Sequence, residues 1–187
     1  ADWVIKAMDA AGQEQSIIVG HSMGSLVAFD VAARYPDRIT ALAMVGTALP
    51  MPVGEVLLNS AKEDSPLAKD MINFWSHSQA GHLGGSQVPG TWMIGKLNRL
   101  LERAGPGVIH NDLLACAEYT KGMERSQDVK APTLLILGED DMMTPVKNAK
   151  ALADAIPESR TVILPNCGHA IVNEAPNEML DALVTLI

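Results

Sequence analysis

The sequence is poor in cysteine, in aromatic residues and in positive charge. Two cysteines among 187 residues are too few for a disulfide framework, and their positions match no zinc-ligand spacing. Fourteen Lys and Arg against 22 Asp and Glu give a formal net charge of −8, which argues against a nucleic-acid or anionic-membrane surface. No apolar run approaches the roughly 18–20 residues that span a bilayer. We therefore expect neither a nucleic-acid partner nor a membrane span.

The composition is otherwise that of a globular protein. Hydrophobic residues make up 48% of the chain, enough for the core of one domain with a small insertion. Ten methionines outnumber the aromatic residues, which suggests a cavity lined by thioethers instead of rings. The chain begins at Ala1 without an initiator Met or a signal peptide, so we interpret it as a piece of a longer protein. A cytoplasmic location is expected.

The hydrophobic pattern predicts alternating strands and helices at both ends of the chain. Residues 16–20 and 39–45 are apolar runs typical of strands buried on both faces. A helix between them ends at Tyr35, before Pro36, and this strand–helix–strand order implies a parallel sheet with a right-handed crossover. Further strands are predicted at residues 132–138 and 161–164, and further helices at residues 3–11, 145–155 and 176–187.

The middle of the chain follows a different pattern. It contains no convincing strand but several helical stretches, at residues 54–62, 66–78, 92–103 and 110–122. We therefore predict a helical insertion over residues 50–127. It divides an α/β core, a partial doubly wound and mainly parallel sheet, into residues 1–49 and residues 128–187.

The segment Gly20-His21-Ser22-Met23-Gly24 fits the pattern G-x-S-x-G, directly after a predicted strand and before a predicted helix. A nucleophilic serine on such a tight turn needs strained backbone angles, and flanking glycines leave room where a Cβ would clash. The following helix directs its N-terminus at the serine and favours negative charge there. The alternative is a glycine-rich turn with an incidental serine, which the flanking strand and helix disfavour.

Two further motifs follow predicted strands. An acidic turn, which contains Glu139, Asp140 and Asp141, leads from a strand into a helix, and one of its carboxylates is placed to orient a histidine. The others are expected to be solvated or to cap the helix. His169 follows the last strand, a suitable position for a general base with a pKa near neutrality. Taken alone, His169 fits a structural role as well as a catalytic one, but the chain order Ser, Asp, His favours a catalytic role.

With these motifs the chain resembles the C-terminal two-thirds of an α/β-hydrolase. Residues 20–24 resemble the family's nucleophile elbow, and residues 138–145 resemble its G-x-x-D-x-x-x-P acid loop, whose spacing selects Asp141. Residues 168–176 resemble its G-H-x-x-x-x-E-x-P histidine loop. Residues 50–127 take the place of a cap insertion. The family has further strands before the elbow, so this fold lacks its N-terminal strands, and the strand at 16–20 is expected to be a bare hydrophobic edge.

The resemblance implies a serine hydrolase that cleaves a small or medium ester, or a related acyl compound, through an acyl-enzyme. Ser22 would be the nucleophile, His169 the general base and acid, and Asp141 the group that orients the imidazole. The backbone N–H of Met23 would be one oxyanion donor. The resemblance implies a small-molecule substrate and calls for neither a metal nor a cofactor. A serine at the elbow disfavours the family's dehalogenases and epoxide hydrolases, which use an aspartate.

Other functions are compatible with the same motifs. C–C bond hydrolases, acyltransferases and cofactor-free haloperoxidases of this family can keep the same triad. A non-catalytic binding module is a further alternative, which the presence of all three triad candidates argues against. The family's second oxyanion donor comes from a loop before the elbow, so we expect this fragment alone to be weakly active or inactive.

Candidate substrate-pocket residues are chosen from the elbow, the insertion and the acid loop: His21, Met71, Trp75, Trp92, Met93 and Met142. Packing among the helices of the insertion is the alternative role for those that lie there. His77 and His82 are five residues apart, but no suitable carboxylate or cysteine completes a metal site, so we expect solvated loop histidines. Cys167 is expected to be a small buried filler and not a second nucleophile.

Overall fold

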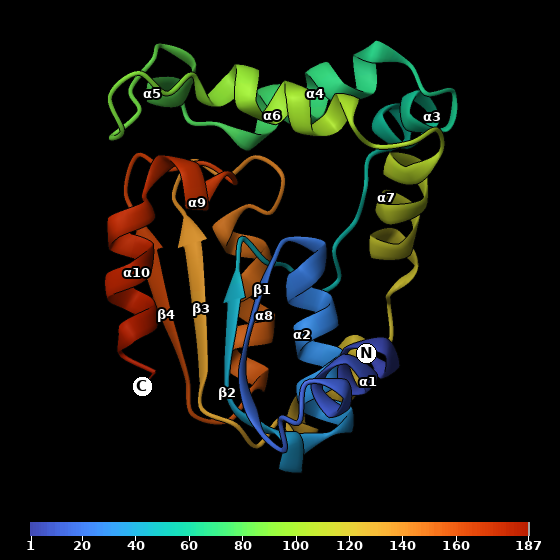
Figure 1. Ribbon diagram of the computed structural model, residues 1–187, viewed down its shortest axis with the longest axis vertical. Coiled ribbons are helices and arrows are strands. Elements are labelled where there is room, and N and C mark those ends of the chain that lie inside the picture. Colours follow the sequence, from blue (N-terminus) through green and yellow to red (C-terminus); the bar gives the residue numbers. More distant parts are fainter. Residues whose placement is uncertain (187) are drawn as a thin grey trace.

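The computed structural model describes residues 1–186 and contains a parallel sheet with the strand order β1-β2-β3-β4 (Figure 1). The strands are β1 (Ser16–His21), β2 (Ile39–Val45), β3 (Thr133–Gly138) and β4 (Ser159–Leu164). The two central strands are buried almost throughout, which explains their continuous apolar sequences. The predicted α/β fold with a parallel sheet is therefore confirmed.

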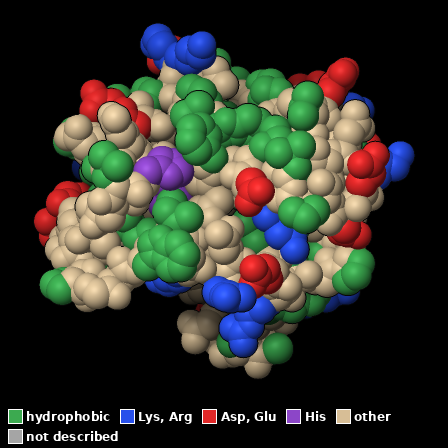
Figure 2. Space-filling view, turned by 90° about the horizontal axis from the view of Figure 1, so that it is seen from above, with side chains coloured by type: hydrophobic (Ala, Val, Ile, Leu, Met, Phe, Trp, Pro, Cys, Tyr) green, Lys and Arg blue, Asp and Glu red, His purple; other side chains and the backbone are tan. Residues whose placement is uncertain are grey.

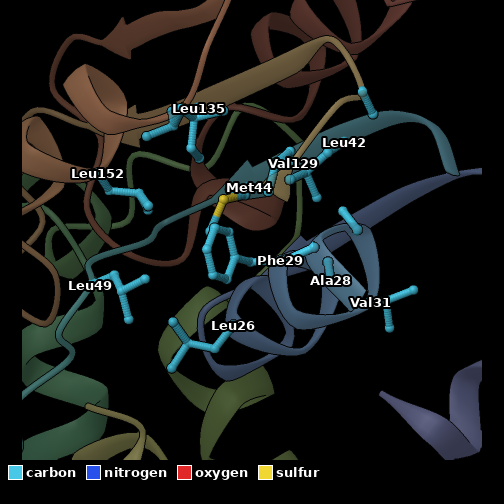
Figure 3. Packing of buried hydrophobic residues seen from close by; sticks show 14 of the residues in the cluster. Leu26, Ala28, Phe29, Val31, Leu42, Met44, Leu49, Val129, Leu135 and Leu152 are labelled. Atoms are coloured by element: carbon cyan, nitrogen blue, oxygen red, sulfur yellow. The ribbon is translucent and has the colours of Figure 1, made fainter. Parts of the chain in front are cut away.

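Helices cover both faces of this sheet. They are α1 (Asp2–Ala10), α2 (Met23–Arg34), α8 (Val146–Ala155), α9 (Ile171–Glu174) and α10 (Pro176–Val184), with a short 3-10 helix η1 (Pro36–Arg38) before β2. On one face Phe29 of α2 packs against Met44 of β2, as Figure 3 shows. On the other face α9 and α10 pack against Leu134 and Ile136 of β3. Residue 187, the end of the helix predicted at residues 176–187, lies outside the described residues.

A helical layer lies above the carboxyl ends of the strands (Figure 1). Its elements are α3 (Glu55–Lys62), α4 (Pro66–Ser76), α5 (Gln79–His82), α6 (Met93–Glu102) and α7 (Val108–Glu118), and the 3-10 helix η2 (Gly122–Asp128) follows it. Residues 50–127 contain no strand. A small apolar cluster around Leu57, Ala61 and Ala68 joins α3 to α4. None of the helices within residues 1–186 combines the length and apolarity that crossing a bilayer requires.

Strand β1 differs from its prediction. The sequence predicts burial on both faces, but Ile17 and Val19 are 42% and 47% exposed. The reason is the position of β1 at the edge of the sheet. On the face to which Ile17 and Val19 point, α9 and α10 cover β3, and β2 separates β3 from β1. The apolar edge that the resemblance implies is therefore present. Strand β4 also begins earlier than predicted, at Ser159.

The central strands should dominate the free energy of unfolding. Leu135 on β3 is fully buried, so Leu135→Ala should lower that free energy by about 2–5 kcal/mol, through lost burial and the cavity left behind. Leu180→Ala is the matched control, because the Leu180 side chain on α10 is 59% exposed and its loss should cost less than about 0.5 kcal/mol. Urea denaturation followed by circular dichroism measures both, and equal losses would contradict this account of the core.

Candidate active site

Ser22 lies on the tight turn between β1 and α2, with backbone angles φ 54° and ψ −123°. Residues other than glycine adopt such a conformation at a cost of about 1–3 kcal/mol, so the surrounding structure must hold it in place. The Ser22 N–H donates to the carbonyl oxygen of Val45 at 2.9 Å, and the Ser22 carbonyl accepts from the Ser25 N–H at 2.8 Å. The turn is thus tied both to the end of β2 and to the first turn of α2.

The two glycines of this turn have different roles. A Cβ on Gly20 would lie 2.0 Å from the carbonyl oxygen of Gly24, so no side chain fits there. A Cβ on Gly24 would meet nothing within 4 Å. The expectation that both glycines avoid clashes is therefore correct for Gly20 and wrong for Gly24, because Gly24 faces open space while Gly20 faces the helix backbone.

The structure brings Ser22, His169 and Asp141 together in one chain of hydrogen bonds. The Nε2 atom of His169 lies 2.8 Å from Oγ of Ser22, and its Nδ1 atom lies 2.8 Å from Oδ2 of Asp141. The three side chains come from the carboxyl ends of β1, β3 and β4, which lie at one edge of the parallel sheet (Figure 1). This is the spacing of a nucleophile, a base and a group that orients the base.

Asp141 is held by the turn that it begins. Its Oδ1 atom accepts from the backbone N–H groups of Met143 and Thr144 at 2.8 and 2.7 Å, and its Oδ2 atom accepts from the Thr144 hydroxyl at 2.7 Å. Burial by itself would raise the pKa of this carboxyl, but the bonds to His169 and Thr144 outweigh burial and lower it. Glu139 and Asp140 are exposed, as expected for the other two carboxylates of the turn.

A second buried carboxylate, Glu174, fixes the loop that carries His169. Its Oε1 atom accepts from the N–H and the hydroxyl of Ser78 at 2.9 and 2.7 Å, and its Oε2 atom accepts from the N–H of Gly168 at 2.6 Å. The Ala170 N–H donates to the Ser76 carbonyl at 2.7 Å. The histidine loop is therefore bound to the helical layer on both sides of His169. The sequence motif contained Glu174, but nothing in it identified Ser78 as the partner.

His21 contacts both the backbone and the ring of His169. Its Nε2 atom lies 2.8 Å from the carbonyl oxygen of His169, and because a carbonyl only accepts, this nitrogen carries the proton. The two rings lie 4.9 Å apart. Burial, followed by the repulsion of a charged His169, lowers the pKa of His21 and favours its neutral form. Gly46 lies against both rings, since a Cβ there would come within 3.1–3.3 Å of their atoms.

Two cavities meet at Ser22. The first has a volume of about 380 Å³ and lies between the helical layer and the acid loop. Its lining is Ser22, Met51, Pro52, Val53, Gly54, Leu57, Trp75, Leu113, Cys116, Met142, Met143 and Thr144. The second has a volume of about 310 Å³ and contains the two histidines. Its lining is His21, Ser22, Ile72, Ser76, Leu97, Leu100, Leu113, Met143, His169, Ala170, Val172 and Asn173.

Three of the six predicted pocket residues line these cavities, namely His21, Trp75 and Met142. The other three do not. Trp92 precedes α6 and is 72% exposed, Met93 is buried inside the helical layer, and Met71 packs against the Leu57 cluster. Met51, Leu113 and Met143 also line the cavities and were not predicted. The positions of Met51 after β2 and of Met143 after β3 were available signals, since strand ends gather at the site.

The remaining predictions concern His77, His82 and Cys167. His82 is exposed, but His77 is buried, and its Nδ1 atom bonds with the carbonyl oxygen of Asn73. The prediction of a solvated loop is therefore wrong for His77, because His77 directly follows α4 and its ring lies 6.0 Å from that of His82 in α5. Cys167 is buried, and burial together with neighbouring carboxylates raises its pKa to about 12, so the thiol stays protonated. Within residues 1–186 no three His, Cys, Asp or Glu side chains form a metal-binding group.

Comparison with known proteins assigns the family. The sequence profile of the alpha/beta hydrolase fold matches residues 1–176, and the chain belongs to that family. Among curated relatives, a Klebsiella pneumoniae protein named a carbamate hydrolase, RutD, is 28% identical over 89% of this chain and 64% of its own. A Comamonas testosteroni protein, named a 2-hydroxy-6-oxononadienedioate/2-hydroxy-6-oxononatrienedioate hydrolase, is 28% identical over 87% of this chain and 59% of its own.

A solved structure of a thermophilic esterase is similar as well. Its TM-score is 0.76 and its identity 28%, over 91% of this chain and 65% of that one. The chain thus spans less than two thirds of the length of each of these three proteins.

The serine turn offers a matched pair of substitutions. Gly20→Ala should lower the free energy of unfolding by about 1–3 kcal/mol or more, because the new Cβ overlaps the Gly24 carbonyl. Gly24→Ala, two residues away, should be neutral or slightly stabilising, since it adds a methyl group to α2 in open space. Thermal unfolding followed by circular dichroism separates them, and equal behaviour of both variants would contradict the described turn.

The lowered pKa of Asp141 predicts a loss of stability in acid. The unfolded chain binds this proton more tightly than the folded chain, so the carboxylate stabilises the fold above its ordinary pKa of 3.8. That contribution should disappear as the pH falls from about 3.8 through the folded-state value. Urea denaturation between about pH 5 and pH 2 measures it, with Asp141→Asn as the control that cannot titrate. A constant difference between the two proteins over this range would contradict the prediction.

Proposed function

We propose that this chain carries the reacting groups of a serine hydrolase that cleaves a small or medium ester or a related acyl compound. One observation supports this most: His169 lies 2.8 Å from both Ser22 and Asp141, and Ser22 itself lies on a strained turn at the carboxyl end of β1. A structural serine has no need of a conformation that costs about 1–3 kcal/mol. The names of the relatives, all hydrolases or an esterase, agree with this class of reaction.

The hydrogen bonds support a distinct role for each group. Because Asp141 accepts from His169, the Nδ1 atom of the ring carries the proton and Nε2 offers a lone pair to the Ser22 hydroxyl. Ser22 Oγ attacks the carbonyl carbon while His169 takes its proton. His169 then protonates the leaving group, and an acyl-enzyme remains on Ser22. A water molecule, activated by the same Nε2 atom, releases the acid and restores the hydroxyl.

The negative charge of the intermediate needs donors already in place. Ser22 directly precedes α2, whose first N–H groups have no partner within the helix and whose dipole is positive at this end. We assign the Met23 N–H as one oxyanion donor. Ser22 therefore lies next to two supporting groups. His169 takes its proton, and the positive end of the α2 dipole stabilises the negative charge that develops.

The proposal is tested by a fluorophosphonate probe followed by intact-mass spectrometry. The folded chain should gain a single adduct on Ser22, and Ser22→Ala should gain none. Cys167→Ala is the control for the buried thiol two residues before His169. It should label like the native chain, because the Cys167 thiol is protonated and does not react. An adduct that persists in Ser22→Ala would overturn the proposal. A folded full-length protein that does not react would overturn it as well, since the second oxyanion donor is expected from a loop before the elbow.

Triad substitutions should also be strongly non-additive. In the full-length protein, Ser22→Ala or His169→Ala should each lower kcat by about 10⁴–10⁶-fold, and the double variant should be no slower than the worse single one. Steady-state hydrolysis of p-nitrophenyl esters gives these rates. Product analysis with unactivated substrates distinguishes ester cleavage from C–C cleavage, acyl transfer and peroxidation on the same triad. Additive losses would show that Ser22 and His169 do not act as a unit.

A further inference from the structure

The cavities on either side of Ser22 differ in one respect that bears on the substrate. His169 lines the second cavity and does not line the first, whereas Ser22 lines both. Leu113 of α7 and Met143 of the acid loop also line both and therefore mark the boundary between them. A bond attacked by Ser22 lies at this boundary, with one part of the substrate on each side.

We propose, on the basis of the serine-hydrolase function above, that the substrate is an uncharged ester whose two apolar arms occupy these two cavities. The acyl arm lies in the first cavity, here named the acyl cavity. The alcohol arm lies in the second, here named the leaving-group cavity.

The position of His169 determines which arm lies where. During cleavage the bond between the carbonyl carbon and the alcohol oxygen breaks, and that oxygen takes its proton from His169 Nε2. The alcohol arm must therefore extend to the side on which the imidazole is exposed, and this is the leaving-group cavity. The acyl arm stays bonded to Ser22 Oγ and extends to the other side, toward Met51, Leu57 and Trp75.

The linings also determine the charge of the substrate. Among the described residues that line either cavity there is no Lys, Arg, Asp or Glu. The nearby cation Lys96 is exposed, and its Nζ atom is bonded to Oδ1 of Asn173 at 2.9 Å. A carboxylate placed in either cavity would lose water without gaining a Lys or Arg partner from the lining, which costs several kcal/mol. The two cavities therefore suit apolar arms and do not suit a dicarboxylate of the kind named for the Comamonas relative.

The test compares three esters of equal length: hexyl hexanoate, the same ester with a terminal carboxylate on the acyl arm, and the same ester with a terminal carboxylate on the alcohol arm. Each carboxylate should lower kcat/KM by at least about tenfold. Rates within about threefold of the neutral ester for either charged ester would overturn the proposal.

Two matched variants locate the arms. Met142 lines only the acyl cavity and Leu100 only the leaving-group cavity, and both side chains are more than half exposed, so an arginine at either place should leave the fold intact. Met142→Arg should restore kcat/KM for the ester charged on the acyl arm, and Leu100→Arg for the ester charged on the alcohol arm. Rescue in the opposite pairing would overturn the assignment of the cavities.

A binding measurement separates this inference from the proposed function. N-hexylhexanamide and its two carboxylated forms are titrated into Ser22→Ala, which needs no turnover, and Trp75 in the acyl cavity reports binding by fluorescence, with Trp75→Phe as the control for the other two tryptophans. Tighter binding of the neutral amide by at least about tenfold supports the charge argument even if Ser22 proves unreactive. Equal binding, or no binding of the neutral amide, would overturn it.

Discussion

A buried carboxylate connects the two halves of this structure. Glu174 accepts three hydrogen bonds, two from Ser78 in the helical layer and one from Gly168 in the histidine loop. A carboxyl group buried in that position would be costly without such donors, so these bonds favour the arrangement in which the layer and the loop meet. The surrounding packing adds to this, because a Cβ on Gly168 or Gly81 would overlap backbone or carboxylate atoms within 2.8 Å. The position of His169 follows from this contact.

The serine is fixed from the opposite side by different means. Its backbone is held by β2 and by the first turn of α2, in a conformation that the chain would not adopt by itself. The acid loop supplies the third point, with Asp141 held by the N–H groups of its own turn. Three short loops on a rigid sheet thus bring three side chains to 2.8 Å contacts. Such prior positioning lowers the reorganisation that a reaction would otherwise require.

The part of this arrangement that the sequence predicts is the part encoded locally. The turn at Ser22 depends on a few neighbouring residues, and Asp141 was chosen because residues 138–145 resemble the spacing of the family's acid loop. The structure places both side chains next to His169. The cavity walls depend instead on how α4, α6 and α7 pack over the sheet. A tryptophan at the start of a helix gives no sign of its direction, so Trp92 was misassigned and Leu113 was missed. The exposure of β1 depends likewise on which helices reach it.

The two kinds of residue at this site lie on different stretches of the chain. The reacting groups come from loops between core elements, while most of the apolar lining comes from residues 51–113. Mutations in that stretch can therefore alter which substrates fit without touching the reacting atoms, and selection can act on the two almost independently. The exception is the segment from Ser76 to Gly81, which supports the histidine loop. Among descendants of this protein, residues of the layer outside that segment should change as the substrate range diverges. Residues within the segment should stay the same.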